Sequence, residues 1–220
     1  MIIMIFDLET NGFKGSSVLQ FTGVKLKYDG KNFKKIASMN EYYLPREKFN
    51  KNAYKVHKIS IEKIKEEFKK RYKKLYMEQK EELGHNFENV KDDLKKSLKG
   101  LRFFENDVFV EDFISDVDVF VGHNIKTFDM KFLPCHLGDK KDFYIFDTML
   151  LNIEEMKLPY KNGKFKSPKL QEACKYYGVE YDEEKAHDSK YDVLVNTNVF
   201  RRMLNKNKFK EILNEGFNNV

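Results

Sequence analysis

The hydrophobic pattern at the start of the chain predicts three β-strands. Residues 1–6 form a continuous apolar run, typical of a strand that is buried on both faces. Residues 17–28 and 33–44 then alternate between apolar and polar positions on either side of Asp29-Gly30, which is a strong hairpin signal. We therefore expect this part of the chain to form antiparallel strands.

A charged, helical segment then interrupts the strand pattern at residues 62–106. Apolar side chains recur at spacings of three and four over residues 61–75 and again over residues 83–101, as they do on amphipathic helices. We expect two such helices to meet near Gly84. Acidic residues are interspersed almost as densely as basic ones, which favours a solvated helical hairpin, although an extended nucleic-acid footprint or a partner surface is open.

The second half of the chain alternates between strands and helices. Apolar runs at residues 117–121 and 143–146 predict strands. The predicted helices run from about Phe128 to Leu137, from Lys169 to Tyr177 with Gly178 as the C-terminal cap, and from Asp188 to Leu204. Antiparallel strands followed by βα units predict an α/β fold, in which helices flank a mixed central sheet of three antiparallel N-terminal strands plus parallel strands.

Length and composition fit a single folded unit. A chain of 220 residues is longer than one typical domain of about 150 residues but shorter than two. With 41% hydrophobic and 15% aromatic residues against 35% charged, it has enough apolar surface for a core, which excludes global disorder. We expect one domain over residues 1–204, interrupted by the insertion at 62–106 and followed by a polar C-terminal tail at 205–220.

Charge, cysteines and hydropathy indicate the setting in which the protein works. A net charge of +6 suits a polyanionic partner but is common in soluble proteins. Cys135 and Cys174 lie far apart without a metal-binding spacing, so a reducing compartment fits better than a disulfide framework. Neither a signal peptide nor an apolar run of about 18 residues is recognisable. We expect a soluble protein in the cytoplasm or another intracellular compartment.

The first candidate for chemistry is a pair of carboxylates after the first strand. Side chains alternate along a strand, so Asp7 and Glu9 project to the same side, where two carboxylates can share hard divalent cations. Two acidic residues at this spacing are also common in a polar turn, and that reading stays open until further residues support the site.

Two further clusters carry polar residues of complementary types. The strand at 117–121 delivers Asn124 and the carboxylate of Asp129 to a sheet end, where sites assemble in α/β folds, although both residues could simply cap a helix. Near the end of the chain, His187 and Asp192 could supply a titratable base and a metal ligand from one short segment. An isolated histidine in such a place is usually a surface residue.

In order and type, these clusters resemble the motifs of the DnaQ-like, or DEDDh, 3′-to-5′ exonucleases of the ribonuclease H-like superfamily. The matching residues are Phe6 through Gly12, then His123-Asn124 with Phe128-Asp129, and finally His187, Ser189 and Asp192. The resemblance covers about residues 1–60 and 107–204, which leaves the charged insertion outside it. The chain departs from the family at Lys58, where glycine is usual, and at Ser189, where alanine is usual.

The resemblance implies a two-metal phosphodiester hydrolase that uses Mg²⁺ or Mn²⁺. Asp7, Glu9 and Asp192 would hold the metal that activates water, and Asp7 and Asp129 would hold the second metal, partly through water. His187 would be the general base, because an imidazole with a pKa of about 6.5 can accept a proton near neutral pH. The product would be a nucleoside 5′-monophosphate.

The same resemblance implies residues that contact the substrate. These candidates are Leu8, Thr10, Asn11, Gly12, His57, Asn124 and Phe128. Leu8 and Phe128 would offer surfaces on which unpaired bases stack, although core packing is an equal alternative for Phe128. Asp147 and Asp188 are expected to cap helices.

The expected partner is single-stranded or 3′-terminal nucleic acid. Three residues separate Asn124 from Phe128, as in three-prime repair exonucleases and some proofreading domains of polymerases, which favours DNA over RNA and makes a DNA polymerase or replication partner possible. An exoribonuclease is the close alternative, since these motifs describe phosphodiester chemistry and not the sugar. A non-catalytic nucleic-acid-binding module is more distant, because all four acidic candidates and His187 are present.

Overall fold

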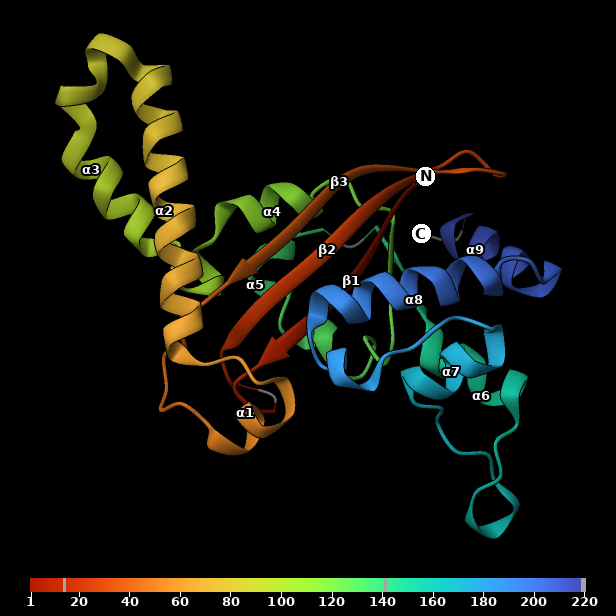
Figure 1. Cartoon of the computed structure of the whole chain (residues 1–220). Helices are drawn as coiled ribbons and strands as arrows, with labels where there is room; N and C mark the ends of the chain where they lie inside the picture. The colour runs from red at the N-terminus through yellow and green to blue at the C-terminus, as the bar shows by residue number, and fades with distance from the viewer. Residues whose placement is uncertain (14, 141, 219–220) are drawn as a thin grey trace.

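A mixed sheet forms the centre of the protein, which is described by a computed structural model for residues 1–13, 15–140 and 142–218 (Figure 1). Within these residues the strands are β1 (Ile2–Thr10), β2 (Val18–Tyr28), β3 (Phe33–Tyr42), β4 (Val119–Gly122) and β5 (Tyr144–Asp147), in the spatial order β3-β2-β1-β4-β5. β2 is antiparallel to both β1 and β3, whereas β4 is parallel to β1 and β5 is parallel to β4. This arrangement confirms the predicted α/β fold.

The first strand is longer than the apolar run predicts. β1 continues through Thr10 because its last residues pair with β2, with Asp7 opposite Thr22 and Glu9 opposite Gln20. The two carboxylates therefore lie within the central strand, where the pleat sends them to one face of the sheet. The turn that follows begins only at Asn11.

Helices cover both faces of the sheet. They are α1 (Lys51–His57), α2 (Ile61–Leu83), α3 (Phe87–Gly100), α4 (Val108–Ile114), α5 (Pro134–Leu137), α6 (Thr148–Met156), α7 (Leu170–Tyr177), α8 (Ser189–Met203) and α9 (Asn207–Asn218). One hydrophobic cluster joins Ile3 and Ile5 of β1 to α8. Another joins Met4 and Phe6 to α4 on the opposite face. Alternate residues of β1 thus anchor the two layers.

Two expected segments differ from the prediction. The helix predicted from Phe128 to Leu137 is instead a single 3₁₀ turn at Asp129–Lys131 and the short α5, because Pro134 has no N–H to continue a helix from the preceding turn. The segment at 205–220, predicted to be a tail, contains α9. Phe209 and Leu213, one helical turn apart, are buried in the same cluster as α8.

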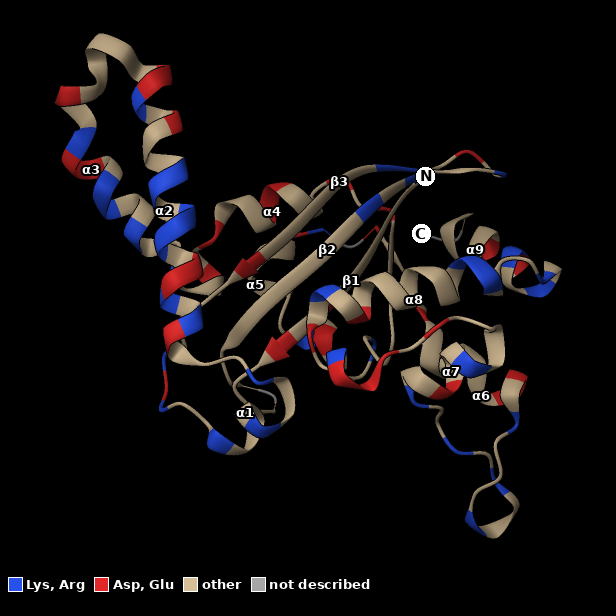
Figure 2. Ribbon diagram, in the orientation of Figure 1, with Lys and Arg blue, Asp and Glu red and all other residues tan. Residues whose placement is uncertain are grey.

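The insertion forms the two predicted amphipathic helices, α2 and α3, which project from the domain as a hairpin joined near Gly84 (Figure 1). Its base is fixed to the domain. The guanidinium of Arg71 donates hydrogen bonds of 2.6 and 2.9 Å to the buried carboxylate of Asp107, which also accepts a 2.7 Å bond from the hydroxyl of Tyr43. Charges of both signs cover the projecting part (Figure 2). Only that outer part is a solvated hairpin.

None of the helices in the described ranges is both long enough and apolar enough to cross a membrane. Cys135 and Cys174 are free thiols.

Candidate active site

The carboxyl ends of β1 and β4 meet at one edge of the sheet because these neighbouring strands run in parallel. Gly122 ends β4, and a Cβ atom there would lie 2.1 Å from Cγ2 of Ile125 and 2.9 Å from the backbone oxygen of Phe6. Only glycine therefore lets the chain after β4 turn back over β1. This turn places the second polar cluster beside the first.

Hydrogen bonds hold the second cluster in place. Oδ1 of Asp129 accepts a 3.1 Å bond from the backbone N–H of Leu8, which joins two motifs that are 121 positions apart. The carboxylate of Asp147 accepts 3.0 Å bonds from the backbone N–H groups of Asn124 and Lys126, and it also caps α6. Asp147 therefore supports the loop, as expected for a helix cap.

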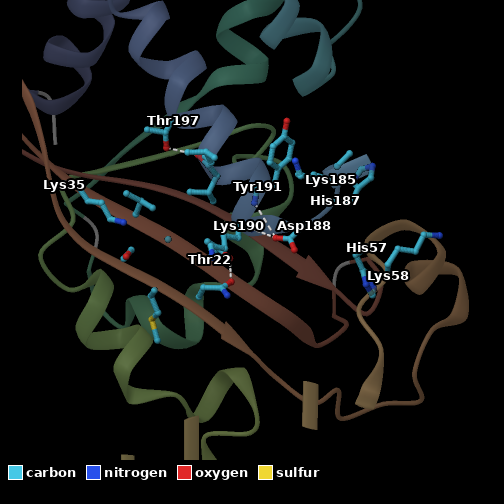
Figure 3. Close-up of a pocket in the computed structure, with 18 of the residues that line it drawn as sticks. Thr22, Lys35, His57, Lys58, Lys185, His187, Asp188, Lys190, Tyr191 and Thr197 are labelled. Carbon is cyan, nitrogen blue, oxygen red and sulfur yellow. Dashed lines mark hydrogen bonds between the residues drawn. The ribbon is translucent and has the colours of Figure 1, made fainter. Parts of the chain in front are cut away.

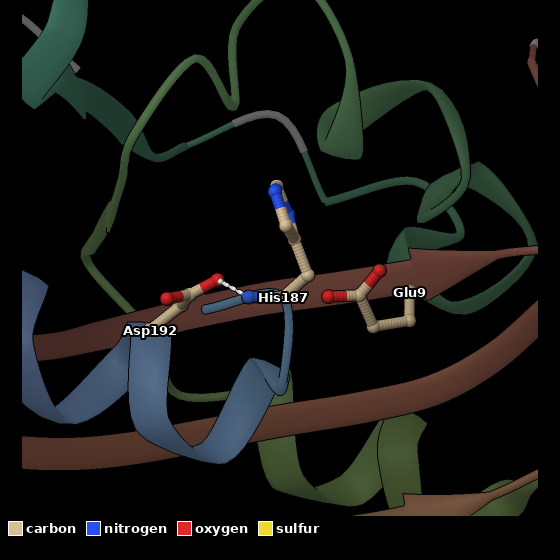
Figure 4. A group of neighbouring side chains, drawn as sticks. All are labelled: Glu9, His187 and Asp192. Carbon is tan, nitrogen blue, oxygen red and sulfur yellow. Dashed lines mark hydrogen bonds between the residues drawn. The ribbon is translucent and has the colours of Figure 1, made fainter. Parts of the chain in front are cut away.

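The third cluster approaches β1 from the start of α8. Asp188 caps this helix by accepting hydrogen bonds from two of its first backbone N–H groups. Oδ2 of Asp192 accepts a 3.1 Å bond from the backbone N–H of His187, whose backbone is left-handed with a φ of 63°. One ligand atom each from Glu9, His187 and Asp192 lies within 4.8 Å of the other two (Figure 4).

Burial of the carboxylates, together with the repulsion among them, dominates the electrostatics of the site. Burial raises the pKa of Asp7 well above its usual value, and the charges of Asp129, Glu9 and Asp192 raise it further. Burial likewise raises the pKa of Glu9, and the charge of Asp192 adds to that effect. The pKa of Asp129 rises to about 7 and that of Asp192 to about 6, in both cases chiefly because of burial. The structure thus gathers the four acidic candidates into one cluster.

The donor set fits hard divalent cations. Oδ1 of Asp192 is buried and has no hydrogen-bond partner, and no basic side chain forms an ion pair with Asp7, Glu9, Asp129 or Asp192 among the described residues. Carboxylate oxygens are the ligands that Mg²⁺ and Mn²⁺ prefer. A bound cation would relieve the repulsion and supply the missing partner of Asp192.

We expect the variant Asp129→Asn to stabilise the metal-free protein, and to do so more at pH 7.5 than at pH 4. In the folded protein the pKa of the Asp129 carboxyl is raised to about 7, so folding favours its protonated form. Its contribution to the free energy of unfolding is therefore fully present below about pH 4 and is lost as the pH rises through 7. Asparagine keeps the oxygen that accepts the bond from Leu8 but has no proton to lose. The gain at pH 7.5 should be on the order of 4 kcal/mol, which corresponds to the rise in the pKa of Asp129 to about 7.

Urea unfolding with chelator at the two pH values tests this expectation. The exposed control Asp93→Asn should change stability little at either pH. A gain for Asp129→Asn that is equal at both pH values would contradict the assigned cause, since only the ionised carboxylate is penalised by burial.

Two histidines flank an adjoining groove of about 910 Å³, which lies between α8 and the strands β2 and β3 (Figure 3). Partial desolvation lowers the pKa of His187, so its ring is neutral near pH 7. His57 is buried. Its Nδ1 accepts a 3.0 Å bond from the N–H of Ile59, and burial lowers its pKa to about 4. The neutral ring therefore carries its hydrogen on Nε2, which has no partner.

The structure places the expected substrate-binding residues in different surroundings. The prediction that Leu8 offers a stacking surface is wrong. Its side chain lies on the face of β1 opposite Asp7, where it is buried in the core and only 4% exposed. Phe128 is half-buried and packs against Phe132, with ring centroids 5.4 Å apart. The side chain of Asn124 accepts a hydrogen bond from the hydroxyl of Thr127 and lies in the loop before Asp129.

Intramolecular hydrogen bonds engage the side chains in the turn from Thr10 to Gly12. The hydroxyl of Thr10 donates a 2.6 Å bond to the carbonyl of Gly12. The amide of Asn11 donates a 2.7 Å bond to Glu47, whose Oε1 also accepts from the backbone N–H of Ser17. Glu47 is a positioning residue that the motifs do not indicate, since it lies 36 positions beyond Asn11 and no local pattern connects the two.

Two departures from the family pattern have local explanations. Lys58 is the left-handed C-cap of α1, with φ 56° and ψ 18°, a conformation that glycine adopts more readily than lysine. The hydroxyl of Ser189 lies 2.6 Å from that of Thr22, so it forms a buried hydrogen bond between α8 and β2 that alanine could not make. Neither departure disturbs the acidic cluster.

Solved exonucleases share this architecture. The chain is similar to exonuclease X in complex with 5′ overhanging duplex DNA, with a TM-score of 0.50, 15% identity and coverage of 93% of each chain. It is also similar to E. coli exonuclease I in complex with a dA16 oligonucleotide, with a TM-score of 0.60, 14% identity, and coverage of 96% of this chain and 42% of that one. The protein therefore shares the fold of these exonucleases.

Among curated proteins, the chain is similar to the PolC-type DNA polymerase III of Ureaplasma parvum serovar 3. The two are 24% identical over 205 residues. The match takes in 92% of this chain but only 11% of the polymerase, so the chain spans a small part of that relative. No protein-family model matches the sequence.

Proposed function

We propose that this protein is a metal-dependent 3′-to-5′ exonuclease that removes nucleoside 5′-monophosphates from the 3′ end of DNA. The observation that carries the proposal is the cluster of four carboxylates beside His187, at the sheet edge where β1 and β4 end. The likeness in fold to exonucleases X and I supports it. A role inside the cell, in proofreading or in trimming ends, is part of the proposal.

Each acidic residue has a distinct place in this proposal. Asp7, Glu9 and Asp192 would hold one divalent cation, and Asp7 and Asp129 would hold the other. Two such ions, when bound, stabilise negative charge on the attacking and leaving oxygens. The chain's own carboxylates fix the positions of both ions relative to the substrate, because Asp7 is within charge-interaction range of the other three.

His187 is assigned as the general base. Its neutral ring lies at the rim of the cluster, within 4.8 Å of ligand atoms of Glu9 and Asp192, where it can take a proton from the attacking water. The hydrogen bond from its backbone N–H to Asp192 holds this segment against the carboxylates. The exposed ring can then pass the proton to solvent.

His57, Asn124 and Phe128 are assigned to the substrate. The unpaired Nε2–H of His57 is a donor for a phosphate oxygen near the scissile bond, and the ring stays neutral because its pKa is about 4. Asn124 offers a polar contact near the 3′ end of the substrate, and Phe128 offers an aromatic edge to the terminal base. For Thr10, Asn11 and Gly12, contact through the backbone is the remaining option. The side chain of Thr10 bonds within the turn, that of Asn11 bonds Glu47, and Gly12 has none.

The preference for DNA and a connection with a polymerase are also proposals. The two structural neighbours are in complex with DNA, and the curated relative is a DNA polymerase. Nothing in the acidic cluster selects the sugar, because the 2′-hydroxyl must be accepted or refused by groups that surround it. The domain limits proposed are residues 1–204, with 62–106 as an insertion, and α9 packs onto the core of that domain.

The test is the release of mononucleotides from matched 3′-terminated single-stranded DNA and RNA. Each is incubated with Mg²⁺, with Mn²⁺ and with chelator. Stepwise, metal-dependent release from DNA with little from RNA would support the proposal in full, whereas faster release from RNA would replace it by an exoribonuclease. Folded protein that releases nothing from either substrate in the presence of metal would overturn the proposed activity of this chain.

A further inference from the structure

A basic hairpin at residues 157–169 connects α6 to α7, and the proposed function does not yet use it. It contains no acidic residue, and its lysines are Lys157, Lys161, Lys164, Lys166 and Lys169. It projects beyond α6 and α7 (Figure 1), and its lysines appear as blue segments along it (Figure 2). So concentrated a positive charge on a projecting segment attracts polyanions.

The basic hairpin has a defined backbone shape. The N–H of Tyr160 donates a 2.9 Å bond to the carbonyl of Lys164, and Pro159 pairs with Phe165 in an antiparallel bridge. At the tip, Asn162 has φ 61° and Gly163 has φ 70°, the left-handed pair of a type I′ turn. The backbone of the basic hairpin is therefore already ordered before a ligand binds to its side chains.

Aromatic side chains accompany the charges. Tyr160 is 60% exposed and Phe165 is 37% exposed, although both are large enough to be expected in a core. Lys161 and Lys164 lie between these two aromatic residues in the sequence, one on each side of the tip. Neither lysine forms an ion pair with a described residue. Exposed rings beside unpaired lysines are suited to unpaired bases and their phosphates.

The base of the basic hairpin is attached to the active-site loop. Nε2 of His123 donates a 2.9 Å hydrogen bond to the carbonyl of Pro168, and His123 directly precedes Asn124. Lys166 forms an ion pair with Glu172, whose carboxylate also accepts a 2.9 Å bond from the N–H of Lys169. The second arm of the basic hairpin therefore has a fixed position relative to the edge of the sheet that carries the acidic cluster.

We propose that the basic hairpin binds the single-stranded stretch of substrate upstream of the 3′-terminal nucleotides. Lys161 and Lys164 contact the phosphates, and Tyr160 and Phe165 stack on the bases. A single strand fits better than a duplex, because paired bases do not expose their faces to an aromatic side chain. This second contact rests on the proposed exonuclease function and would make binding depend on oligonucleotide length.

Fluorescence anisotropy with labelled oligothymidylates, measured in chelator over a series of KCl concentrations, tests the contact without hydrolysis. We expect Lys161→Ala/Lys164→Ala to weaken binding of a 20-nucleotide strand about tenfold and to reduce the salt slope by about 1.4. Tyr160→Ala/Phe165→Ala should weaken binding tenfold or more at every salt concentration and leave that slope nearly unchanged. Both effects should shrink for a strand of four nucleotides.

A matched control removes two lysines elsewhere. Lys31 and Lys34 are exposed near the β2–β3 turn, at the opposite end of β1 from the acidic cluster. Lys31→Ala/Lys34→Ala lowers the net charge by the same amount and should leave binding within about twofold of wild type. If the control and the hairpin variants weaken binding equally, or if neither does, the proposed contact is wrong. Equal unfolding midpoints would show that all variants fold alike.

A separate measurement keeps the two proposals distinguishable. The p-nitrophenyl ester of thymidine 5′-monophosphate is too small to reach beyond the active site, so its metal-dependent hydrolysis by the wild type reports on the exonuclease chemistry alone. Hydrolysis of the ester with unchanged binding by the hairpin variants would overturn only the hairpin contact. Failure to hydrolyse either the ester or oligonucleotides would overturn the activity, while anisotropy would still decide the contact.

Discussion

Replacing Asp7 with alanine is expected to lower metal-dependent release of mononucleotides at least about a thousandfold. Asp7 lies in the middle strand of the sheet, and its charge interacts with those of Glu9, Asp129 and Asp192. It is the one carboxylate assigned to both cations, so its loss removes electrostatic stabilisation from the attacking and the leaving oxygen together. Folding should be retained, because the substitution also relieves repulsion within the cluster.

Single-turnover degradation of a 3′-labelled oligonucleotide measures this effect, and calorimetric titration with Mn²⁺ measures metal binding in the same preparations. Asp93→Ala, which removes an exposed carboxylate from α3, is the matched control and should behave as wild type in both measurements. If Asp7→Ala kept substantial activity, the assignment of both metal sites would be wrong, whatever the substrate.

The variant His187→Ala should reduce turnover by about 10² to 10⁴ and change its dependence on pH. A general base must be unprotonated to act, so wild-type turnover should rise with pH through the pKa of His187. Partial desolvation lowers the pKa of His187, so the rising limb of the pH profile should lie below the usual histidine pKa of about 6.5. The variant should lack the limb, because water then loses its proton directly to solvent.

Turnover measured under saturating substrate between pH 5 and 8.5 tests the assignment. His85→Ala removes an exposed histidine between α2 and α3 and should retain the wild-type profile. Unchanged affinity for Mn²⁺ in His187→Ala would fit a base, whereas a large loss of affinity would make His187 a ligand together with Glu9 and Asp192. A variant that kept the limb would exclude His187 as the titrating group.

Much of the fold followed from local patterns. Alternation predicted the β2–β3 hairpin, and spacings of three and four predicted α2 and α3, because strands and helices bury one face at periods set by the backbone. Gly178 and Asp188 also fall at the predicted helix ends. Caps and turns depend on a few adjacent residues, so they are visible without the rest of the chain.

Other features depended on distant parts of the chain. β1 extends through Thr10 only because β2 is there to pair with it, and α9 forms because Phe209 and Leu213 are buried in the core. The same holds for Arg71, whose ion pair with Asp107 fixes the insertion to the domain. None of these contacts leaves a local signal.

The sequence by itself determined which residues are candidates for chemistry, since the types and order of Asp7, Glu9, Asp129, His187 and Asp192 can be read directly. Tertiary structure alone decided that they share one cluster, that Leu8 faces the core, and that Glu47 holds the turn after β1. The physical reason is that spacing along a strand or helix sets only the direction of a side chain. What it meets there, and therefore its pKa and its partners, depends on segments brought together by the sheet.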